Sequence, residues 1–336
     1  MLDIARLDKA AREDLFVNTG HKTGMNPAII EKDFWVCFIL DHLFHRSQWK
    51  DAFVFKGGTS LSKAFHVIER FSEDIDLIMD WRLIDCSDEL AWQERSRNKQ
   101  DQFGKKLVKA ASGFLSGTFI QSLGDGLEKE LGYKITVAMD EYDEDQCTVN
   151  IYYDHAFSDS YLRPEIRLEI GPLAEWTPSH ERVIRPFAAE AYPNAFTTGS
   201  TQIRTVDAER TFWEKVLILH KTAYSCKEKG VPHRYARHYY DLYCMYNSDI
   251  KDGAFARREL LEQDALFKQK FYYTKSTRYD AAKPGSIKLV PEDSESIAKL
   301  FEDYKNMKDM IYGTAPDFEA ILATIQTLQD EINSMN

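Results

Sequence analysis

The sequence predicts an α+β protein with an α/β front half and a mostly helical back half. Two observations support this prediction. Short apolar stretches alternate with helical patterns up to about residue 200, and four amphipathic helical patterns follow that point. At 336 residues the chain can bury a substantial core and form one large domain or two. We therefore expect two domains, residues 1–204 and residues 205–336.

The front half is expected to begin with helices and to continue with strands. Asn26 suits a helix cap, and Pro27 suits the first position of a helix whose apolar residues recur on one face. Short strands are predicted over residues 52–55 and 75–79, with a helix over residues 60–70 between them. The order of this part is therefore strand, tight turn, helix and strand.

Further strands are predicted in the middle of the chain, and helices after it. Residues 133–139 and 148–153 are typical of an antiparallel pair around an acidic loop. Residues 165–170 alternate between apolar and charged side chains, as a strand with one buried face does. The predicted helices of the back half span residues 207–224, 234–246, 295–313 and 316–333.

The overall charge and composition limit the function. A net charge of −11 argues against a protein that coats nucleic acid without specificity. Residues 221–238 and 268–288 are nevertheless basic, so they are expected either to grip one polyanion locally or to be solvated surface segments. No apolar run reaches the roughly 18 residues that cross a bilayer, and the opening residues are too charged for a signal peptide. Five scattered cysteines without a CxxC pair favour a reducing cytoplasm.

The segment "KGGTS", residues 56–60, predicts an anion site. Gly57 or Gly58 can adopt a positive φ and bring bare backbone N–H groups close to a ligand. The helix predicted to follow points its positive dipole end at the same place, and phosphate is the expected anion. The segment matches neither the Walker motif nor GxGxxG, and a plain tight turn is the alternative.

Asp74 and Asp76 predict a metal site. They stand two residues apart at the start of a strand, so both side chains leave the same face. Two such carboxylates repel each other unless a cation lies between them, and Mg²⁺ prefers oxygen ligands with waters and phosphates. Mn²⁺ is the alternative ion, and a solvated pair without metal is the alternative interpretation. Together with the glycine turn, the pair predicts a site for a nucleoside triphosphate and in-line attack at phosphorus.

These motifs also resemble a known family. Gly-Gly-Thr-Ser, a helix and Asp-x-Asp are similar to the signature of the polymerase-β-like nucleotidyltransferase fold. The fuller string "FKGGTSLSKAF…RFSEDIDL" resembles the AbiEii/AbiGii toxins of type IV toxin–antitoxin and abortive-infection systems, which include the MenT enzymes. "EKDFWVCFIL", "ERTFWEKVLILHK", "RHYYDLY" and "GSIKLVP…FEDYKNM" resemble further parts of that family. The resemblance implies a polymerase-β-like core whose helical C-terminal domain completes the active site.

The resemblance implies roles for individual residues. The nucleotide-binding residues would be Lys56, Gly57, Gly58, Thr59, Ser60 and Lys215. Asp74 and Asp76 would hold the metals, and Lys215 would neutralise charge on the phosphates as pyrophosphate leaves. For Lys215 the alternative is the polar side of an amphipathic helix. Asp241 would orient Lys215 or a substrate group, and its aromatic neighbours predict that this carboxylate is paired.

Candidate residues can also be named for the general base and for binding of the acceptor. Many enzymes of this fold use a third carboxylate to activate the attacking hydroxyl, and Glu169 is the candidate because its strand phase places it opposite the apolar face. Arg167 shares that face, and a simple ion pair with Glu169 is the alternative. Arg210, Arg234 and Arg237 are candidates for holding an acceptor's phosphates, because the guanidinium fork suits them.

The sequence therefore predicts a Mg²⁺-dependent nucleotidyltransferase that moves a nucleoside monophosphate from an NTP to an acceptor. The family resemblance implies a growth-inhibiting bacterial toxin with a cognate antitoxin protein, and the 3′ end of tRNA as the acceptor. One alternative is an enzyme that nucleotidylates or phosphorylates a protein hydroxyl. Another is a nucleotide-binding module without turnover that acts through a partner.

Overall fold

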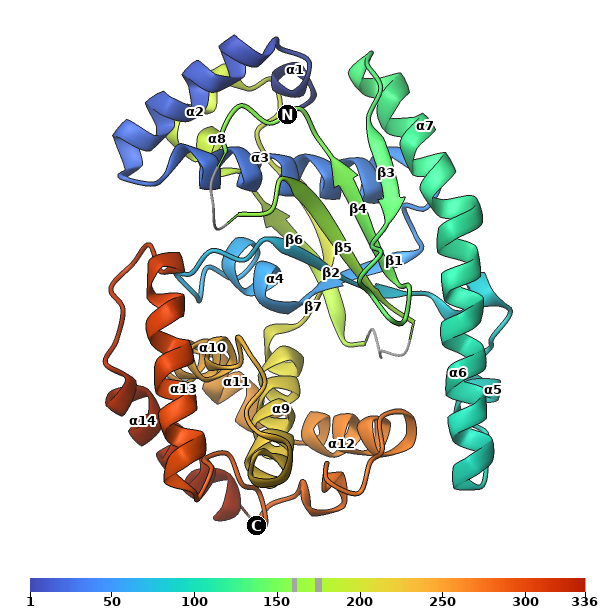
Figure 1. The fold of residues 1–336 in the computed structure, drawn as a ribbon, viewed down its shortest axis with the longest axis vertical. Coiled ribbons are helices and arrows are strands. Elements are labelled where there is room, and N and C mark those ends of the chain that lie inside the picture. Colours follow the sequence, from blue (N-terminus) through green and yellow to red (C-terminus); the bar gives the residue numbers. More distant parts are fainter. Residues whose placement is uncertain (159–161, 173–176, 336) are drawn as a thin grey trace. The chain divides into compact units, whose positions relative to one another are not determined.

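The computed structural model describes residues 1–158, 162–172 and 177–335 (Figure 1). The chain forms two compact units. The first contains Met1–Ala64 and Ser72–Val206, and the second contains Phe65–Phe71 and Asp207–Asn336. A mixed seven-stranded sheet in the first unit and helices in both confirm the predicted α+β class.

The first unit is built on one mixed sheet. Its strands are β1 (Phe53–Lys56), β2 (Asp74–Met79), β3 (Thr136–Met139), β4 (Thr148–Tyr152), β5 (Glu165–Gly171), β6 (Ser179–Ile184) and β7 (Thr201–Val206). They follow the order β3-β4-β5-β2-β1-β7-β6. The central strand β2 pairs antiparallel with β1 and parallel with β5. The five strands predicted from the sequence are confirmed, whereas β6 and β7 were not predicted.

Helices surround this sheet in the first unit (Figure 1). They are α1 (Leu2–Ala5), α2 (Lys9–Thr23), α3 (Pro27–Asp41), α4 (Gly57–Lys63), α5 (Asp88–Trp92), α6 (Arg97–Phe114), α7 (Ile120–Leu131) and α8 (Phe187–Ala191). The predicted start of α3 is confirmed, because the Asn26 side chain accepts a hydrogen bond from the Ala28 N–H and Pro27 is the first helical residue. Almost every residue of α3 is buried, so this helix belongs to the core of the unit.

The two faces of β2 have different environments, and this difference positions the carboxylates. Ile75 and Leu77 point to one face, where they join the main hydrophobic core of the unit. Asp74, Asp76 and Ile78 occupy the alternate positions and share the other face. On that face Ile78 packs in a small separate apolar cluster with Val54 and Val206. The apolar C-terminal end of this face fixes the register of β2. The two aspartates occupy the N-terminal end of the same face.

The helix predicted over residues 60–70 is wrong in its second half. Helix α4 ends at Lys63, and His66 has a φ of 52°, which a helix does not allow. The segment of residues 65–71 instead forms hydrogen bonds with residues 310–313 of the second unit, including the Phe71 N–H to the Met310 carbonyl at 2.8 Å. Pairing with a distant part of the chain has overridden the local helical pattern.

The second unit is helical apart from its connecting segments. Its helices are α9 (Ala208–Lys229), α10 (Ala236–Tyr246), α11 (Ile250–Ala256), α12 (Glu259–Phe271), α13 (Ser294–Met307) and α14 (Phe318–Asn333). The four predicted helices are confirmed, although the one predicted over residues 295–313 ends at Met307. Helices α11 and α12 were missed. The buried stripe of α14 consists of Phe318, Ile321, Ile325, Leu328 and Ile332, as its apolar spacing predicted. Within the described part of the chain, no helix combines the length and the apolar composition that spanning a membrane requires.

Candidate active site

The predicted carboxylate pair lies at the start of β2, in the middle of the sheet. Asp74 is opposite Arg167 of β5, and Asp76 is opposite both Lys56 of β1 and Glu169 of β5. Both aspartates are half-buried and on the same face, so the predicted geometry of the pair is confirmed. This face therefore presents carboxylates from two adjacent strands, β2 and β5.

The glycine turn lies directly against one carboxylate of this pair, that of Asp76. Gly57 has a φ of +80°, a conformation that side chains rarely allow. A Cβ atom added to Gly57 would lie 2.0 Å from Oδ2 of Asp76. The absence of a side chain thus lets the backbone of the turn lie against the Asp76 carboxylate. The requirement for glycine here is both conformational and steric.

Substitution of Gly57 is expected to damage the site more than the fold. In Gly57→Ala the new methyl group must displace the Asp76 carboxylate, and the left-handed backbone alone costs about 1–2 kcal/mol. We expect nucleotidyl transfer to fall by at least tenfold, measured as product formed from labelled NTP. Gly113→Ala is the matched control, because Gly113 lies in α6 and an added Cβ has no neighbour within 4 Å. A Gly57→Ala enzyme with normal activity would contradict the close packing of turn and carboxylate.

The other residues of the turn hold it in place. The buried Thr59 hydroxyl donates hydrogen bonds to the carbonyls of Ser72, at 3.2 Å, and Asp74. The buried Ser60 hydroxyl donates to the Gly57 carbonyl at 2.9 Å. These bonds tie α4 to the segment that enters β2, so they position the turn next to the aspartates. Direct contact of Lys56, Gly58, Thr59 or Ser60 with a nucleotide stays a prediction.

Arg167 lies among the carboxylates of this face. Its guanidinium is 2.7 Å from Asp140, 3.3 Å from Glu169 and 3.5 Å from Asp74. Burial by itself would lower the pKa of Arg167, but the three carboxylates raise it above its ordinary value. The ion pair with Glu169 is present, as one of the two interpretations of that residue predicted. The contacts with Asp74 and Asp140 were not foreseen, although the strand phase already placed Arg167 on the same face.

A second cluster of charged side chains lies within the helical unit. Asp241, on α10, is completely buried and its pKa lies far below the ordinary value, because Arg70 and Lys215 outweigh the effect of burial. Arg70 donates to both carboxylate oxygens, with Nε at 2.7 Å from Oδ1 and Nη2 at 2.9 Å from Oδ2. The Nζ atom of Lys215, on α9, is 2.7 Å from Oδ2. The predicted pairing of Asp241 is confirmed, and its role in a reaction stays a prediction.

Lys215 is a buried cation rather than part of a solvated helix face. Its side chain is 6% exposed, and burial lowers its pKa while Asp241 raises it. The Nζ atom is 3.5 Å from Nδ1 of His238, and an ammonium group can only donate, so the neutral His238 ring accepts there. Burial, together with the charges of Lys215 and Arg237, holds the pKa of His238 well below its ordinary value. The alternative of a solvent-facing Lys215 is therefore wrong.

The three arginines proposed for an acceptor differ in their environment. Arg210 is 1% exposed, and its guanidinium pairs with the equally buried Asp264 at 3.0 Å. A core ion pair of this kind is not available to an acceptor, which corrects the prediction for Arg210. Arg234 and Arg237 are half-buried at the start of α10, and the backbone N–H of Arg234 donates to Asp303 at 2.7 Å. Their contact with an acceptor stays a prediction.

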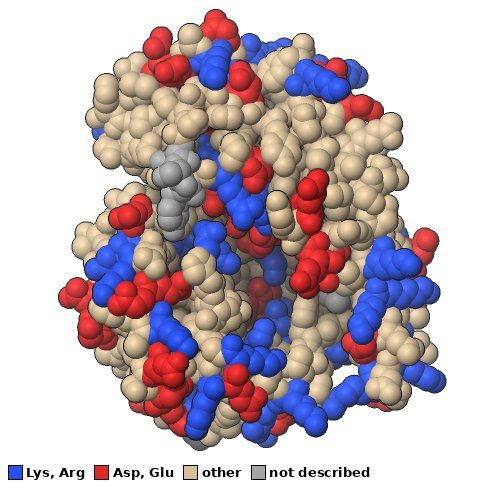
Figure 2. All heavy atoms as spheres, in the orientation of Figure 1, with Lys and Arg blue, Asp and Glu red and all other residues tan. Residues whose placement is uncertain are grey.

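The two basic stretches of the back half meet around one aromatic side chain. The Arg278 guanidinium lies 5.3 Å, and the Lys288 Nζ atom 5.2 Å, from the ring centre of Tyr224. Lys221, one turn before Tyr224, has its pKa lowered by burial and by the charges of Lys268 and Lys229. Side chains of both stretches thus gather in one region of the second unit. Both cations also pair with a carboxylate, Arg278 with Asp280 and Lys288 with Glu292. On the face of the molecule in Figure 2, charges of both signs are interspersed.

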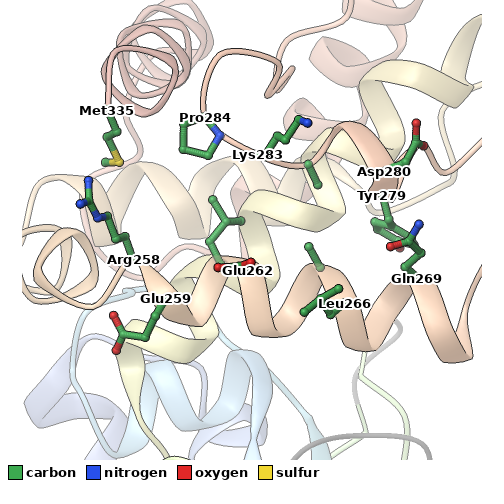
Figure 3. A pocket seen from close by; sticks show the side chains of 13 residues that line it. Arg258, Glu259, Glu262, Leu266, Gln269, Tyr279, Asp280, Lys283, Pro284 and Met335 are labelled. Atoms are coloured by element: carbon green, nitrogen blue, oxygen red, sulfur yellow. The ribbon is translucent and has the colours of Figure 1, made fainter. Parts of the chain in front are cut away.

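A separate cavity of about 620 Å³ lies in the second unit, alongside α12 (Figure 3). Its lining combines apolar side chains such as Leu261 and Leu266 with charged ones of both signs, including Arg258, Glu262 and Lys283. None of the residues predicted for the active site lines this cavity. Its size alone therefore does not make it the site of the predicted reaction.

Arg70 is the residue of the charged cluster in the second unit that the sequence interpretation missed. It stands four residues before Asp74 in the string "RFSEDIDL", within the segment predicted as helix. Its partner Asp241 is 171 residues away in the chain, so local spacing carries no sign of the contact. The sequence signal that pointed to such a contact is Asp241 itself, because a carboxylate among aromatic neighbours needs a cationic partner.

A match to a family model agrees with the predicted chemistry. The family model described as "Nucleotidyl transferase AbiEii toxin, Type IV TA system" matches residues 39–324, which is most of the chain. Among solved structures, MenT4, a nucleotidyltransferase toxin from Mycobacterium tuberculosis H37Rv, is similar over 97% of both chains, with a TM-score of 0.47 and 16% sequence identity. The search of curated proteins returns no match.

Proposed function

Since the chain belongs to the AbiEii family of nucleotidyltransferase toxins, we propose that it transfers a nucleoside monophosphate from an NTP to the 3′ end of tRNA and thereby inhibits growth. Family membership makes the chain an NTP-using nucleotidyltransferase of a type IV toxin–antitoxin system. The acceptor, the metal ion and the effect on growth are the proposed parts. A cytoplasmic setting, where NTP and tRNA are available, and a cognate antitoxin protein belong to the same proposal.

The observation that carries the proposal is the contact between the glycine turn and the aspartate pair. Gly57 packs against the Asp76 carboxylate, and Asp74 is on the same face of β2. Backbone N–H groups near a glycine turn suit phosphate oxygens, and carboxylates suit the cation that accompanies them. A triphosphate with its metal needs both kinds of group within a few ångströms of each other.

The donor set fits Mg²⁺ as part of a shared site. Asp74 and Asp76 offer oxygen ligands and are partly exposed, whereas Arg167 balances the neighbouring charge. Among the residues that the structure describes, no group of three carboxylate, histidine or cysteine side chains is arranged to hold an ion alone. A two-carboxylate site of this kind suits an ion that keeps waters and phosphate oxygens as its other ligands. When bound, Mg²⁺ would supply charge neutralisation on the phosphate oxygens.

In the proposed reaction the acceptor hydroxyl oxygen forms a bond to the α-phosphorus while the bond to pyrophosphate breaks. Glu169 is our candidate for accepting the hydroxyl proton, because it lies opposite Asp76 in the sheet and its side chain is 40% exposed. Lys215 would balance the charge that develops on the leaving pyrophosphate. Asp241 would hold the Lys215 ammonium group in place through their 2.7 Å contact.

RNA as the acceptor is supported by the basic region of the second unit. Arg278 and Lys288 lie over the ring of Tyr224 and also pair with Asp280 and Glu292. The charge of Lys268 acts on Lys221, one turn before Tyr224. An aromatic ring with cations beside it suits single-stranded RNA. Because the net charge of the whole chain is −11, such a local concentration of positive charge is needed for RNA to bind. Arg234 and Arg237 are proposed to extend this contact.

The acceptor can be identified by following which molecule receives the label from an α-labelled NTP. We offer the purified chain α-labelled NTP and Mg²⁺ with either total tRNA or the purified cognate antitoxin. We expect it to place the label on tRNA, in a form removed by digestion from the 3′ end. Lys221→Glu combined with Lys268→Glu is expected to reduce labelling of tRNA and make it more sensitive to salt. The same variant should leave its affinity for NTP unchanged. Label found on protein would instead identify a protein hydroxyl as the acceptor, and NTP binding without label transfer would favour a binding module.

A further inference from the structure

The Arg70–Asp241–Lys215 cluster places two cations against one carboxylate. Arg70 already satisfies both oxygens of Asp241 through two parallel hydrogen bonds, a geometry in which one guanidinium balances one carboxylate. Lys215 approaches the same carboxylate as a second cation. All three side chains are buried, so water screens these charges only weakly.

The donors of Lys215 are not all used within the protein. An ammonium group has three N–H donors, and those of Lys215 have two partners, Asp241 at 2.7 Å and the His238 ring at 3.5 Å. Within the described ranges of the chain, no third partner of this ammonium group is found. The positive charge of Arg237, on the same helix as Asp241, also acts on Lys215. The cluster thus combines excess positive charge with an available N–H donor.

We propose that Arg70 is a positioning residue for the reaction: by saturating Asp241, it leaves the Lys215 ammonium group as the uncompensated charge that meets the phosphates of the NTP. This inference rests on the proposed function and extends it to a residue outside the predicted motifs. Without Arg70, Lys215 would form an exclusive ion pair with Asp241. Its charge would then be largely cancelled before any phosphate arrived.

A positioning role accounts for the buried arginine in the segment of residues 65–71. That segment joins the glycine turn to the aspartate pair along the chain, yet it belongs to the second unit. The alternative is a purely structural role, in which Arg70 only anchors the segment to α10. The two roles differ in their effect on Lys215: a positioning role changes its protonation and the rate, whereas a structural role changes stability alone.

The direction of the effect on Lys215 follows from the charges around it. Burial lowers the pKa of Lys215 most, Asp241 raises it, and Arg70 and Arg237 lower it further. Removal of Arg70 takes away one of the lowering influences, so the pKa of Lys215 should rise. Activity that needs the ammonium form would then persist to higher pH, although at a lower rate because Asp241 cancels more of the charge.

Arg70→Gln and Arg70→Lys test this inference. We expect Arg70→Gln to lower kcat by about tenfold or more, the range usual when a residue that orients a functional group is lost. The alkaline limb of its pH–rate profile should move to higher pH. Arg70→Lys keeps one cation at Asp241 and should recover part of the rate. The matched control is Arg210→Gln, which removes an equally buried arginine–aspartate pair in the same unit and should leave the pH profile unchanged.

A measurement that does not need turnover separates this inference from the proposed function. Titration of Lys215 by NMR, in protein labelled at the lysine Cε and assigned with Lys215→Gln, should show a higher pKa in Arg70→Gln than in the native chain. An unchanged Lys215 titration, with only a loss of stability, would overturn the positioning role. Failure of the proposed function would appear differently, as a native chain that transfers no label. If Arg70→Gln does not fold, the comparison of Arg70→Lys with the native chain decides by the same titration.

Discussion

Asp76→Asn is expected to reduce nucleotidyl transfer by roughly 10³-fold, which corresponds to the loss of about 4 kcal/mol of transition-state stabilisation by a bound metal ion. The substitution keeps the shape of the side chain and removes the charge that holds the cation. Because Asp76 is half-buried beside the Gly57 backbone, the fold should tolerate an isosteric amide. The rate of product formation from labelled NTP at saturating Mg²⁺ measures this effect.

The matched control is Asp101→Asn, which removes an exposed carboxylate that pairs with Lys105 on α6. This variant should retain full activity, because an exposed pair on a helix surface contributes little. Equal activity of Asp76→Asn and Asp101→Asn would show that the Asp76 carboxylate takes no part in the reaction. Growth inhibition that survives Asp76→Asn in cells would in turn favour a toxin that acts without turnover.

Asp241→Asn is expected to lower the free energy of unfolding by about 3–5 kcal/mol, because it leaves two buried cations without their carboxylate. Activity should fall as well, since Lys215 loses the group that holds it. At acidic pH the native chain should lose this same stabilisation: the pKa of Asp241 is depressed, so its contribution is complete above the ordinary aspartate pKa and declines below it. Urea unfolding followed at several pH values measures both effects.

Asp264→Asn provides the comparison for Asp241→Asn. Asp264 is equally buried and pairs with Arg210 in the same unit, so a comparable loss of stability is expected. Its substitution should leave the turnover of the folded fraction near normal. If the two variants lose activity in the same proportion as they lose stability, Asp241 has a structural role alone.

Local periodicity was sufficient to predict the part of the site that one strand carries. The two-residue repeat of β2 placed Asp74 and Asp76 on one face, and the same repeat placed Glu169 and Arg167 on one face of β5. These predictions needed no information from distant parts of the chain. Edge strand β6 escaped prediction because its side chains are mostly exposed and pair only with β7, so it shows no apolar alternation.

Contacts between distant segments were not predictable in the same way. The helix expected over residues 60–70 ends early because residues 65–71 take their backbone partners from residues 310–313. Arg210 fits the pattern of an exposed basic residue on an amphipathic helix, yet it is buried and forms an ion pair with the buried Asp264. Patterns in a single sequence indicate which side chains share one face of a helix or strand. They do not indicate which charged partner a buried group contacts in the folded chain.

In the proposed reaction this chain cleaves an NTP between its α- and β-phosphates and transfers the nucleoside monophosphate to the acceptor. The most direct measurement compares transfer from NTP labelled at the α-phosphate with transfer from NTP labelled at the γ-phosphate. We predict that the native chain transfers the α label and releases the γ label as pyrophosphate, and that Asp76→Asn does neither. Transfer of the γ label, or α-label transfer undiminished in Asp76→Asn, would contradict this account.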